Sequence, residues 1–303
     1  MRNMRQLYNR VTLTTICLLV IACAGTSTAV RQVTETKLSS DGKQIFLSFA
    51  DIEGSILKGY FDPSSISHVV DTSPGYSDGS VAGALGALIG QAIVNSGEVK
   101  RNQAAAENRR NEIVSVYNSD FRGFELDKIK QKLVEQSISL KNGAASRGFL
   151  DYDAKKNEYA AGDYIVLITP TVLMPENKDT LMCETRVQVY DSSLLLEPLY
   201  DNDIKVVSSR VNSKNIEDYW SENDYEALAS TGEQLMLESI LIAHNIILDK
   251  LKEGAEKTHK YWFDGDRKFE RGAEYSSRCG LTLVRNLRGN YLAFPNDEAC
   301  EEE

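Results

Sequence analysis

The chain has 303 residues, of which 42% are hydrophobic and 26% charged, and its formal net charge at pH 7 is −10. This length is sufficient for one large domain or two small ones with a substantial buried core. The acidic charge argues against binding to nucleic acid and against broad adsorption to an anionic membrane, because both surfaces repel a negatively charged protein.

The first 22 residues have the order of a secretory signal peptide. Met1 to Arg10 contains three arginines and no acidic residue, and Val11 to Ala22 is almost wholly apolar. An apolar core of about a dozen residues is too short to cross a bilayer of ~30 Å as a helix. We therefore expect residues 1–22 to be removed on export.

This signal ends in Val20-Ile21-Ala22-Cys23, which resembles the lipobox of bacterial lipoproteins. The resemblance implies that Cys23 carries the lipid, with palmitate among its acyl chains, and becomes the mature N-terminus. Each buried CH₂ of such chains adds ~0.8 kcal/mol to membrane binding. Ala24 is not the aspartate that retains lipoproteins in the inner membrane of enteric bacteria. For a protein of such a bacterium, the family rule implies a cell-envelope protein anchored in the outer membrane and facing the periplasm.

Residues 23–36 are rich in Ser and Thr, which is typical of a tether, and we expect the envelope domain to occupy residues 37–303. Runs rich in β-forming residues predict strands over Ile45 to Phe49, Ile56 to Phe61 and Ile66 to Val70.

A glycine-rich apolar segment follows, residues 79–97, with the sequence GSVAGALGALIGQAIVNSG. Gly79, Gly83, Gly86 and Gly90 recur at spacings of four, three and four, which places them on one side of a helix. Glycine inside a helix costs ~1 kcal/mol relative to alanine, so the repeat indicates close packing of helices. The pattern resembles the glycine-zipper segments of bacterial envelope proteins.

The apolar part of this segment, Val81 to Val94, would span roughly 21 Å as a helix, which is less than the ~30 Å hydrocarbon core of a bilayer. Three alternatives remain. The helix packs inside its own domain or against a copy of itself, it enters or crosses a membrane within an assembly, or the segment is a flexible loop.

Periodicity predicts the elements in the middle of the chain. Residues 101–117 and 124–140 have helical patterns. Tyr164 to Met174 and Thr180 to Tyr190 are strand-like runs joined by a polar turn, which predicts a hairpin. Pro170 lacks an N–H donor, so we expect the first of these strands to be bulged or at a sheet edge. Ile204 to Val211 predicts another strand.

The last third of the chain predicts one long helix and two hairpins. Ser221 to Leu251 has an apolar stripe at helical spacing, and Thr231 with Gln234 resembles a capping box. Turn residues after Tyr261-Trp262-Phe263 predict the first hairpin. The second runs from residues 281–284 to residues 291–294. The aromatic cluster at 261–263 has two interpretations, core packing, which we favour, and a surface for a partner or a saccharide.

Five cysteines occur, of which Cys17 lies in the signal and Cys23 at its end. The alternation around Cys183 directs that thiol into the core. Cys279 and Cys300 flank the second terminal hairpin, so we expect a disulfide between them in an oxidising compartment. The alternative is three unpaired thiols.

The strongest enzymatic motif is Gly75-Tyr76-Ser77-Asp78-Gly79, which matches the G-x-S-x-G pattern of α/β-hydrolases. Its context is unfavourable, because four residues separate it from the preceding strand-like run and the strands pair as hairpins instead of alternating with helices. A lipid-anchored serine hydrolase using Ser77 is therefore an alternative to the main hypothesis.

Metal and cofactor sites are not indicated. The three histidines, His68, His244 and His259, are not at ligand spacing, and there is no C-x-x-C, H-E-x-x-H, calcium-loop, phosphate-loop or dinucleotide pattern. We expect no metal site, no cofactor and no catalytic residue.

These observations predict an α+β domain in which antiparallel β-hairpins are packed by two or three helices, with the glycine-rich apolar helix in addition. The main hypothesis is an envelope lipoprotein that acts without catalysis, through assembly or partner binding, with Gly79 to Val94 as an oligomerisation or membrane-contact element. Its expected partners are the membrane, through the lipid, and other envelope proteins or copies of itself. The combination of a lipid anchor and a glycine-rich stretch loosely resembles that of the surface-exclusion lipoproteins of conjugative plasmids. A further alternative is a periplasmic ligand-binding or chaperone-like module.

Overall fold

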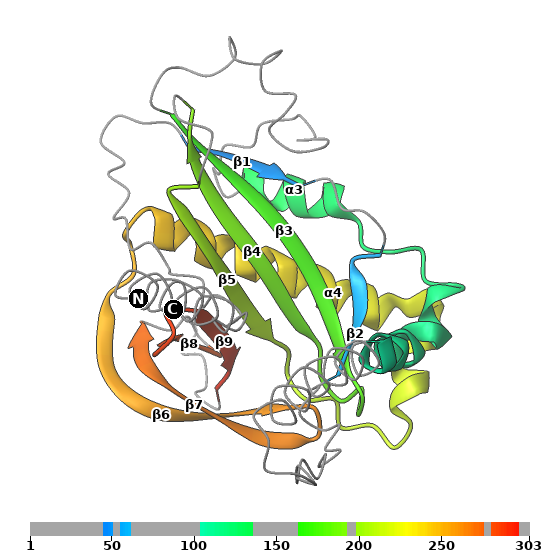
Figure 1. Cartoon of the computed structure of the whole chain (residues 1–303). Coiled ribbons are helices and arrows are strands. Elements are labelled where there is room, and N and C mark those ends of the chain that lie inside the picture. The colour runs from blue at the N-terminus through cyan, green and yellow to red at the C-terminus, as the bar shows by residue number, and fades with distance from the viewer. Residues whose placement is uncertain are drawn as a thin grey trace, which may run out of the picture. The chain divides into compact units, whose positions relative to one another are not determined.

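The computed structural model describes residues 45–50, 55–61, 104–135, 163–192, 198–275 and 280–296, all of which belong to one compact unit, Glu35–Glu303. Within these ranges the fold is α+β, as expected, with nine strands in one mixed sheet (Figure 1). The strands follow the order β1-β3-β4-β5-β9-β8-β7-β6, and β2 also pairs with β3.

The first half of the sheet is centred on a hairpin of long strands. β3 (Tyr164–Pro175) and β4 (Met182–Asp191) are antiparallel, as the sequence predicts, and β5 (Tyr200–Val207) continues the antiparallel pairing. The expected strand at 204–211 therefore begins four residues earlier and ends at Val207. Beyond that point Ser208 N–H donates to Leu181 O at 2.8 Å, which extends the contact with the chain before β4 by one residue.

β3 is an interior strand, so the expected edge position is wrong. β1 (Ile45–Phe49) and β2 (Leu57–Tyr60) run parallel to β3 one after the other along its free side, pairing with residues 164–168 and 172–175. Val172 N–H donates to Ile56 O, and Pro170, two positions earlier, directs its backbone nitrogen to the same side. Pro170 thus faces the interval between β1 and β2, and a position between two described pairings is compatible with its lack of an N–H donor.

The second half of the sheet consists of the two expected terminal hairpins. β6 (Glu253–Phe263) and β7 (Asp266–Tyr275) are joined by a two-residue turn in which Asp264 and Gly265 both have positive φ, the geometry that suits the twist of a tight hairpin. β8 (Leu281–Asn286) pairs with β7 and with β9 (Tyr291–Pro295), and β9 runs parallel to β5.

Helix α4 (Ile216–Ile247) lies along one face of β3, β4 and β5 (Figure 1). Its buried stripe contains Met236, Ile240, Ala243 and Ile247, as the sequence predicts. The helix begins five residues before the predicted start, with the Asn215 side chain accepting from Asp218 N–H, so the predicted capping box at Thr231 and Gln234 is wrong. Those two residues lie within the helix.

Two further helical segments cover the same side as α4. Residues 104–118 are helical and bury Ala106, Ile113, Val114 and Tyr117, and α3 (Leu126–Glu135) buries Ile129 and Leu133. With α4 they form the larger hydrophobic core on this face of the sheet. Gly59 of β2 is required for the close approach, because a Cβ there would overlap the carbonyl of Arg110.

A smaller core lies on the other face of the sheet, where the β6–β7 hairpin curves past the end of β5 toward β2 (Figure 1). Its buried members are Met182, Val207, Phe263, Val284, Leu292 and Phe294. The ring of Phe263 meets that of Tyr60 edge to face at 5.0 Å, which brings the last strand of the sheet to the side of β2. The curvature therefore lets one sheet enclose a core of its own.

Candidate functional site

The turn between β3 and β4 contains a buried carboxylate that joins three distant segments. Asp179 is 3% exposed, and its side chain accepts hydrogen bonds from Arg210 Nε at 3.1 Å, Trp262 Nε1 at 2.7 Å and the Gly265 backbone N–H at 3.2 Å. Its own carbonyl accepts from Val211 N–H at 2.7 Å. Asp179 thus fixes the loop after β5 and the tip of the β6–β7 hairpin to the same turn.

Neighbouring residues of the turn extend these connections. Asn177 Nδ2 donates to Asp264 O at 2.9 Å, at the hairpin tip, and Glu176 forms an ion pair with Arg109 on helix 104–118. Lys178 pairs with Glu217 at the start of α4. The β3–β4 turn is therefore a junction at which helix 104–118, α4 and the β6–β7 hairpin meet.

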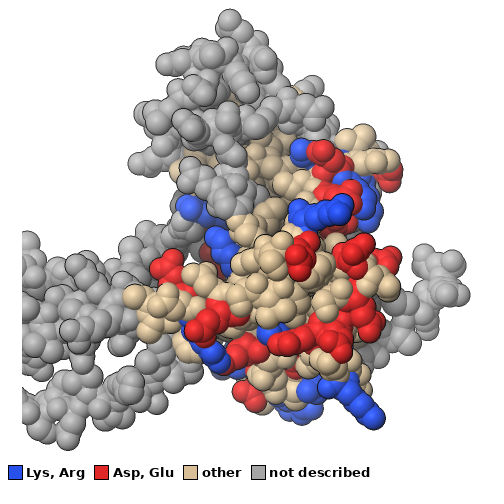
Figure 2. Space-filling model, turned by 90° about the vertical axis from the view of Figure 1, so that its right-hand side faces the viewer, with Lys and Arg blue, Asp and Glu red and all other residues tan. Residues whose placement is uncertain are grey.

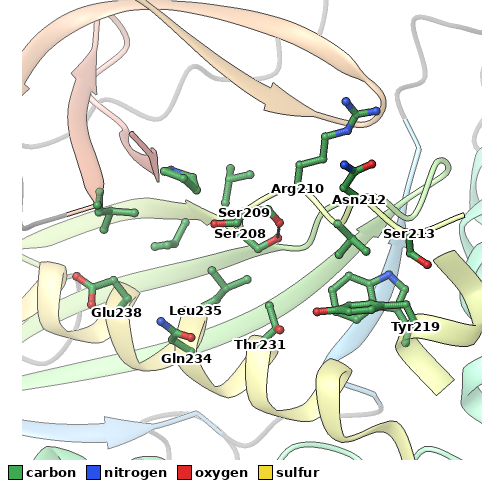
Figure 3. Close-up of a pocket in the computed structure, with 17 residues that line it drawn as sticks. Ser208, Ser209, Arg210, Asn212, Ser213, Tyr219, Thr231, Gln234, Leu235 and Glu238 are labelled. Atoms are coloured by element: carbon green, nitrogen blue, oxygen red, sulfur yellow. Dashed lines mark hydrogen bonds between the residues drawn. The ribbon is translucent and has the colours of Figure 1, made fainter. Parts of the chain in front are cut away.

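Next to this junction is a cavity of about 520 Å³, which we call the α4 cavity. Its walls are residues 206–213 from the end of β5 and the following loop, Tyr219, Trp220 and one side of the second half of α4, and Gly280, Leu281 and Pro295 from the terminal hairpin (Figure 3). The cavity exists because β5 leaves β9 after Val206, which opens the sheet beside α4.

Aliphatic side chains line the α4 cavity together with hydroxyl, amide and aromatic groups. Thr231, Gln234 and Glu238 line it from successive turns of α4, and Ser209 and Asn212 from the opposite loop. Figure 3 shows Arg210 extending away from the cavity, and its guanidinium lies 4.0 Å from the centre of the Trp262 ring. That guanidinium is held by Asp179 and Trp262. The cavity lining also includes the carboxylate of Glu238.

One wall of the cavity belongs to a short helical piece set off by a left-handed turn. Asn223, Asp224 and Tyr225 have φ of 51°, 55° and 65°, and they separate the first turns of α4 from the rest. A left-handed conformation costs an L-residue about 1–2 kcal/mol, least for Asn and Asp. The Tyr225 ring is held at 6.2 Å from Tyr117 and 5.9 Å from Phe121 by centroid distance, so aromatic packing fixes the turn.

A buried polar cluster lies between β4 and α4. Cys183 is fully buried and unpaired, as the sequence predicts, with its sulfur 3.4 Å from Thr185 Oγ1. Thr185 Oγ1 and Ser239 Oγ are 2.6 Å apart, and Ser239 Oγ donates to Met236 O at 2.8 Å. Burial raises the pKa of the Cys183 thiol to about 11. The thiol is therefore protonated at neutral pH, and its contacts fasten α4 to the sheet.

The two described histidines lie apart from the α4 cavity. His244 is on α4, where burial and then Lys250 lower its pKa. His259 is 6% exposed on β6, where burial and Lys257 lower its pKa while Glu274 acts in the opposite direction. Its ring meets Phe294 edge to face at 6.0 Å, which places it in the smaller core.

The aromatic cluster at 261–263 serves as core packing, the interpretation we favoured. Tyr261 stacks on Phe294 at 5.3 Å, Phe263 is buried, and Trp262 is the hydrogen-bond donor to Asp179. Asp179 and Arg210 were not singled out from the sequence. An acidic residue in the turn between two apolar strands is common, and the local sequence does not distinguish a buried acidic residue from an exposed one.

Several predicted site residues lie outside the described ranges. These are the lipidation cysteine, the helix-packing glycines, the serine motif, one histidine and the expected disulfide pair: Cys23, Gly79, Gly83, Gly86, Gly90, Ser77, His68, Cys279 and Cys300. The predicted strand over 66–70 also falls there. All of these remain predictions from the sequence.

Among the described residues there is no group of three or more His, Cys, Asp or Glu side chains that could hold a metal ion. No helix within these same ranges is long and apolar enough to span a membrane.

Comparison with models of known protein families, with curated proteins and with solved structures gives no match to this chain.

Proposed function

We propose that this protein is a membrane-anchored envelope lipoprotein that acts without catalysing a reaction, by assembling with itself or by binding a partner. The lipid would be carried by Cys23, at the end of a signal peptide of residues 1–22. The glycine-rich apolar segment from Gly79 to Val94 would be the oligomerisation or membrane-contact element. In this account the domain of residues 37–303 is held at the outer membrane and faces the periplasm.

The chemistry of the α4 cavity is the observation that best supports binding over catalysis. Its side chains are suited to holding a ligand or a partner segment, because hydroxyl and amide groups donate and accept hydrogen bonds without changing charge. The arginine beside it is engaged by Asp179, and the Cys183 thiol is buried with a raised pKa. These ionisable groups therefore stabilise the fold.

This cavity also favours the second candidate, a ligand-binding or chaperone-like module. A volume of about 520 Å³ is within the range of small-molecule sites. The two candidates share the lipid anchor and differ in whether the glycine segment or the cavity makes the essential contact.

The serine hydrolase is the less favoured alternative. In α/β-hydrolases the nucleophile follows a strand of a mainly parallel sheet whose strands alternate with helices. The pairing described here is antiparallel from β3 to β5 and again from β9 to β6. This arrangement supports an interpretation of Gly75-Tyr76-Ser77-Asp78-Gly79 as a turn sequence.

These candidates are separated by crosslinking in intact cells, with three variants compared with the unchanged protein. We expect Ser77→Ala to keep the same crosslinked neighbours, and Gly83→Leu or Gly86→Leu to lose them while the domain stays folded. Neighbours that survive both glycine substitutions would favour the ligand-binding module. Labelling of Ser77 by a fluorophosphonate probe would contradict the proposal.

A further inference from the structure

Among the described residues, strand β6 has one long edge without a partner strand. It is 11 residues long, it ends the strand order, and its hydrogen-bonded neighbour is β7. Within the part of the chain that the structure describes, no strand pairs with its other side. Such an edge carries unpaired N–H and C=O groups at every second residue, and these can pair with another strand.

The exposed face of this edge has a charge pattern that is complementary to itself. Glu256, Thr258 and Lys260 alternate along β6 on one face, and all three are exposed. If a second copy of β6 runs antiparallel with a two-fold axis at Thr258, Glu256 of each copy lies opposite Lys260 of the other. The two threonines then face each other. Opposite charges and Thr–Thr pairs are both favourable across antiparallel strands.

Registers centred on the other residues from Glu256 to Lys260 do not share this property. A two-fold axis perpendicular to the sheet places the side chain of a given residue on the same face in both copies. Directly opposite residues in antiparallel strands also share a face. A residue can therefore lie opposite only itself or a residue an even number of positions away in the sequence. Centring the axis on Glu256, Lys257 or Lys260 places like charges opposite each other. Centring it on His259 places Lys260 opposite Thr258, so no opposite charges meet. Centring it on Ala255 would place Lys257 opposite Glu253, but the strand is irregular between Glu253 and Glu256. Among the axes from Glu256 to Lys260, the one at Thr258 alone gives two opposite-charge pairs.

The other face of the strand is compatible with the same register. On that face, the register centred on Thr258 places Lys257 of one copy opposite His259 of the other. Lys257 Nζ already lies 2.5 Å from Glu274 Oε2 of its own chain, so its charge is compensated. His259 is buried in the smaller core and directs its ring to Phe294, away from the edge.

We propose that β6 is a self-association edge, at which residues 256–260 of two copies pair antiparallel around Thr258 and join the two sheets into one. This inference deepens the assembly role proposed above, because it names a second copy of the chain as the partner. It rests on that proposed role, because the proposed lipid anchor is what holds both copies at one membrane surface. A five-residue contact is smaller than the interface of a stable dimer in solution. Confinement of both copies to one membrane by their lipid anchors raises their effective concentration and favours pairing.

A cysteine at the two-fold axis tests the register directly. In Thr258→Cys the two thiols would lie on residues with Cα atoms about 4.5–5.5 Å apart, within reach of a disulfide. The matched control is Arg271→Cys, because Arg271 is exposed and lies directly opposite Thr258 on β7. Its two copies would be about 14 Å apart, too far for a disulfide. We expect full-length Thr258→Cys in native membranes to form a disulfide-linked dimer, and Arg271→Cys and the unsubstituted protein to form none.

Charge reversal in the Thr258→Cys background tests the ion pairs. Glu256→Lys or Lys260→Glu makes both pairs repulsive, and we expect the crosslinked fraction to fall roughly tenfold. The double variant Glu256→Lys/Lys260→Glu restores opposite charges and should recover the crosslink. When the two single variants are produced together, they should crosslink to each other and not to themselves. Thermal unfolding of each variant shows whether the fold is intact.

Equal crosslinking of Thr258→Cys and Arg271→Cys would overturn the proposal, as would single variants that crosslink as well as the parent. Adding Gly83→Leu separates this inference from the proposed function. We expect the Thr258→Cys dimer to persist in that background, because β6 pairing does not use the glycine segment. Loss of other neighbours with the dimer retained would identify the glycine segment as a separate contact.

Discussion

The indole nitrogen of Trp262 donates a hydrogen bond of 2.7 Å to Asp179 Oδ2, although the two residues are 83 positions apart in the sequence. Through this bond the tip of the β6–β7 hairpin is fixed to the turn between β3 and β4. The same carboxylate holds Arg210, which is one of the residues that line the α4 cavity. The shape of the cavity therefore depends on a contact made outside it.

We expect Asp179→Ala to lower the free energy of unfolding by about 2–3 kcal/mol, because the partly buried Trp262 and Gly265 donors would lose their acceptor. Denaturant unfolding measures the effect. Asp266→Ala is the control, since the Asp266 side chain is 78% exposed and its loss should cost less than about 0.5 kcal/mol. Equal losses for the two variants would show that Asp179 is not a junction.

Substitution of Gly59 tests the close approach of β2 to helix 104–118. A methyl group at this position overlaps the Arg110 carbonyl, so the two backbones must separate, and we expect Gly59→Ala to destabilise the domain by about 1–3 kcal/mol. Lys58→Ala, at the exposed neighbouring position, should be close to neutral. Thermal unfolding of both variants decides the matter, and an unchanged melting temperature for Gly59→Ala would contradict the packing described.

The Cys183 thiol should resist alkylation in the folded protein. It is fully buried and its pKa is raised to about 11, so both access and thiolate formation are suppressed at pH 8. Mass spectrometry after iodoacetamide treatment should find no adduct at Cys183 until denaturant is added. Rapid modification of Cys183 in native buffer would mean that the contact between α4 and β4 opens readily.

Stability should decrease in mildly acidic solution because of the buried histidines. Burial lowers the pKa of His259 and of His244 below the ordinary value of 6.5, so the unfolded chain binds protons first as the pH falls. The contribution of these two histidines to the free energy of unfolding is fully present above about pH 7. It is lost as the pH falls below 6.5 toward the pKa values of the folded state. In urea unfolding between pH 5 and 7.5, the free energy of unfolding should depend less on pH for His259→Gln than for the unchanged protein. Identical slopes would contradict the burial of His259.

Local patterns predicted the elements well where one face of an element is buried along its length. Alternation around Cys183 located β4 and its inward thiol, and helical spacing located the buried stripe of α4. Element ends were less predictable. Thr231 and Gln234 match a helix start, but the second part of α4 begins earlier, directly after the left-handed turn at residues 223–225. That turn is fixed by packing of Tyr225 against Tyr117 and Phe121.

Pairing between distant segments was not predictable from local pattern. Pro170 suggested an edge strand. In the structure β3 is an interior strand whose neighbour on one side consists of two separate strands, β1 and β2, and Pro170 faces the interval between them. The junction at Asp179 likewise depends on Arg210 and Trp262, which are 31 and 83 positions away. No local signal in the sequence connects these residues.

The central claim is that the protein acts at a membrane to which it is tethered by lipid on Cys23. Mass spectrometry of the mature N-terminus tests this most directly. We predict a mature chain that begins at Cys23 and carries acyl groups on it. A mature chain that begins at Val30, or that has an unmodified Cys23, would contradict it.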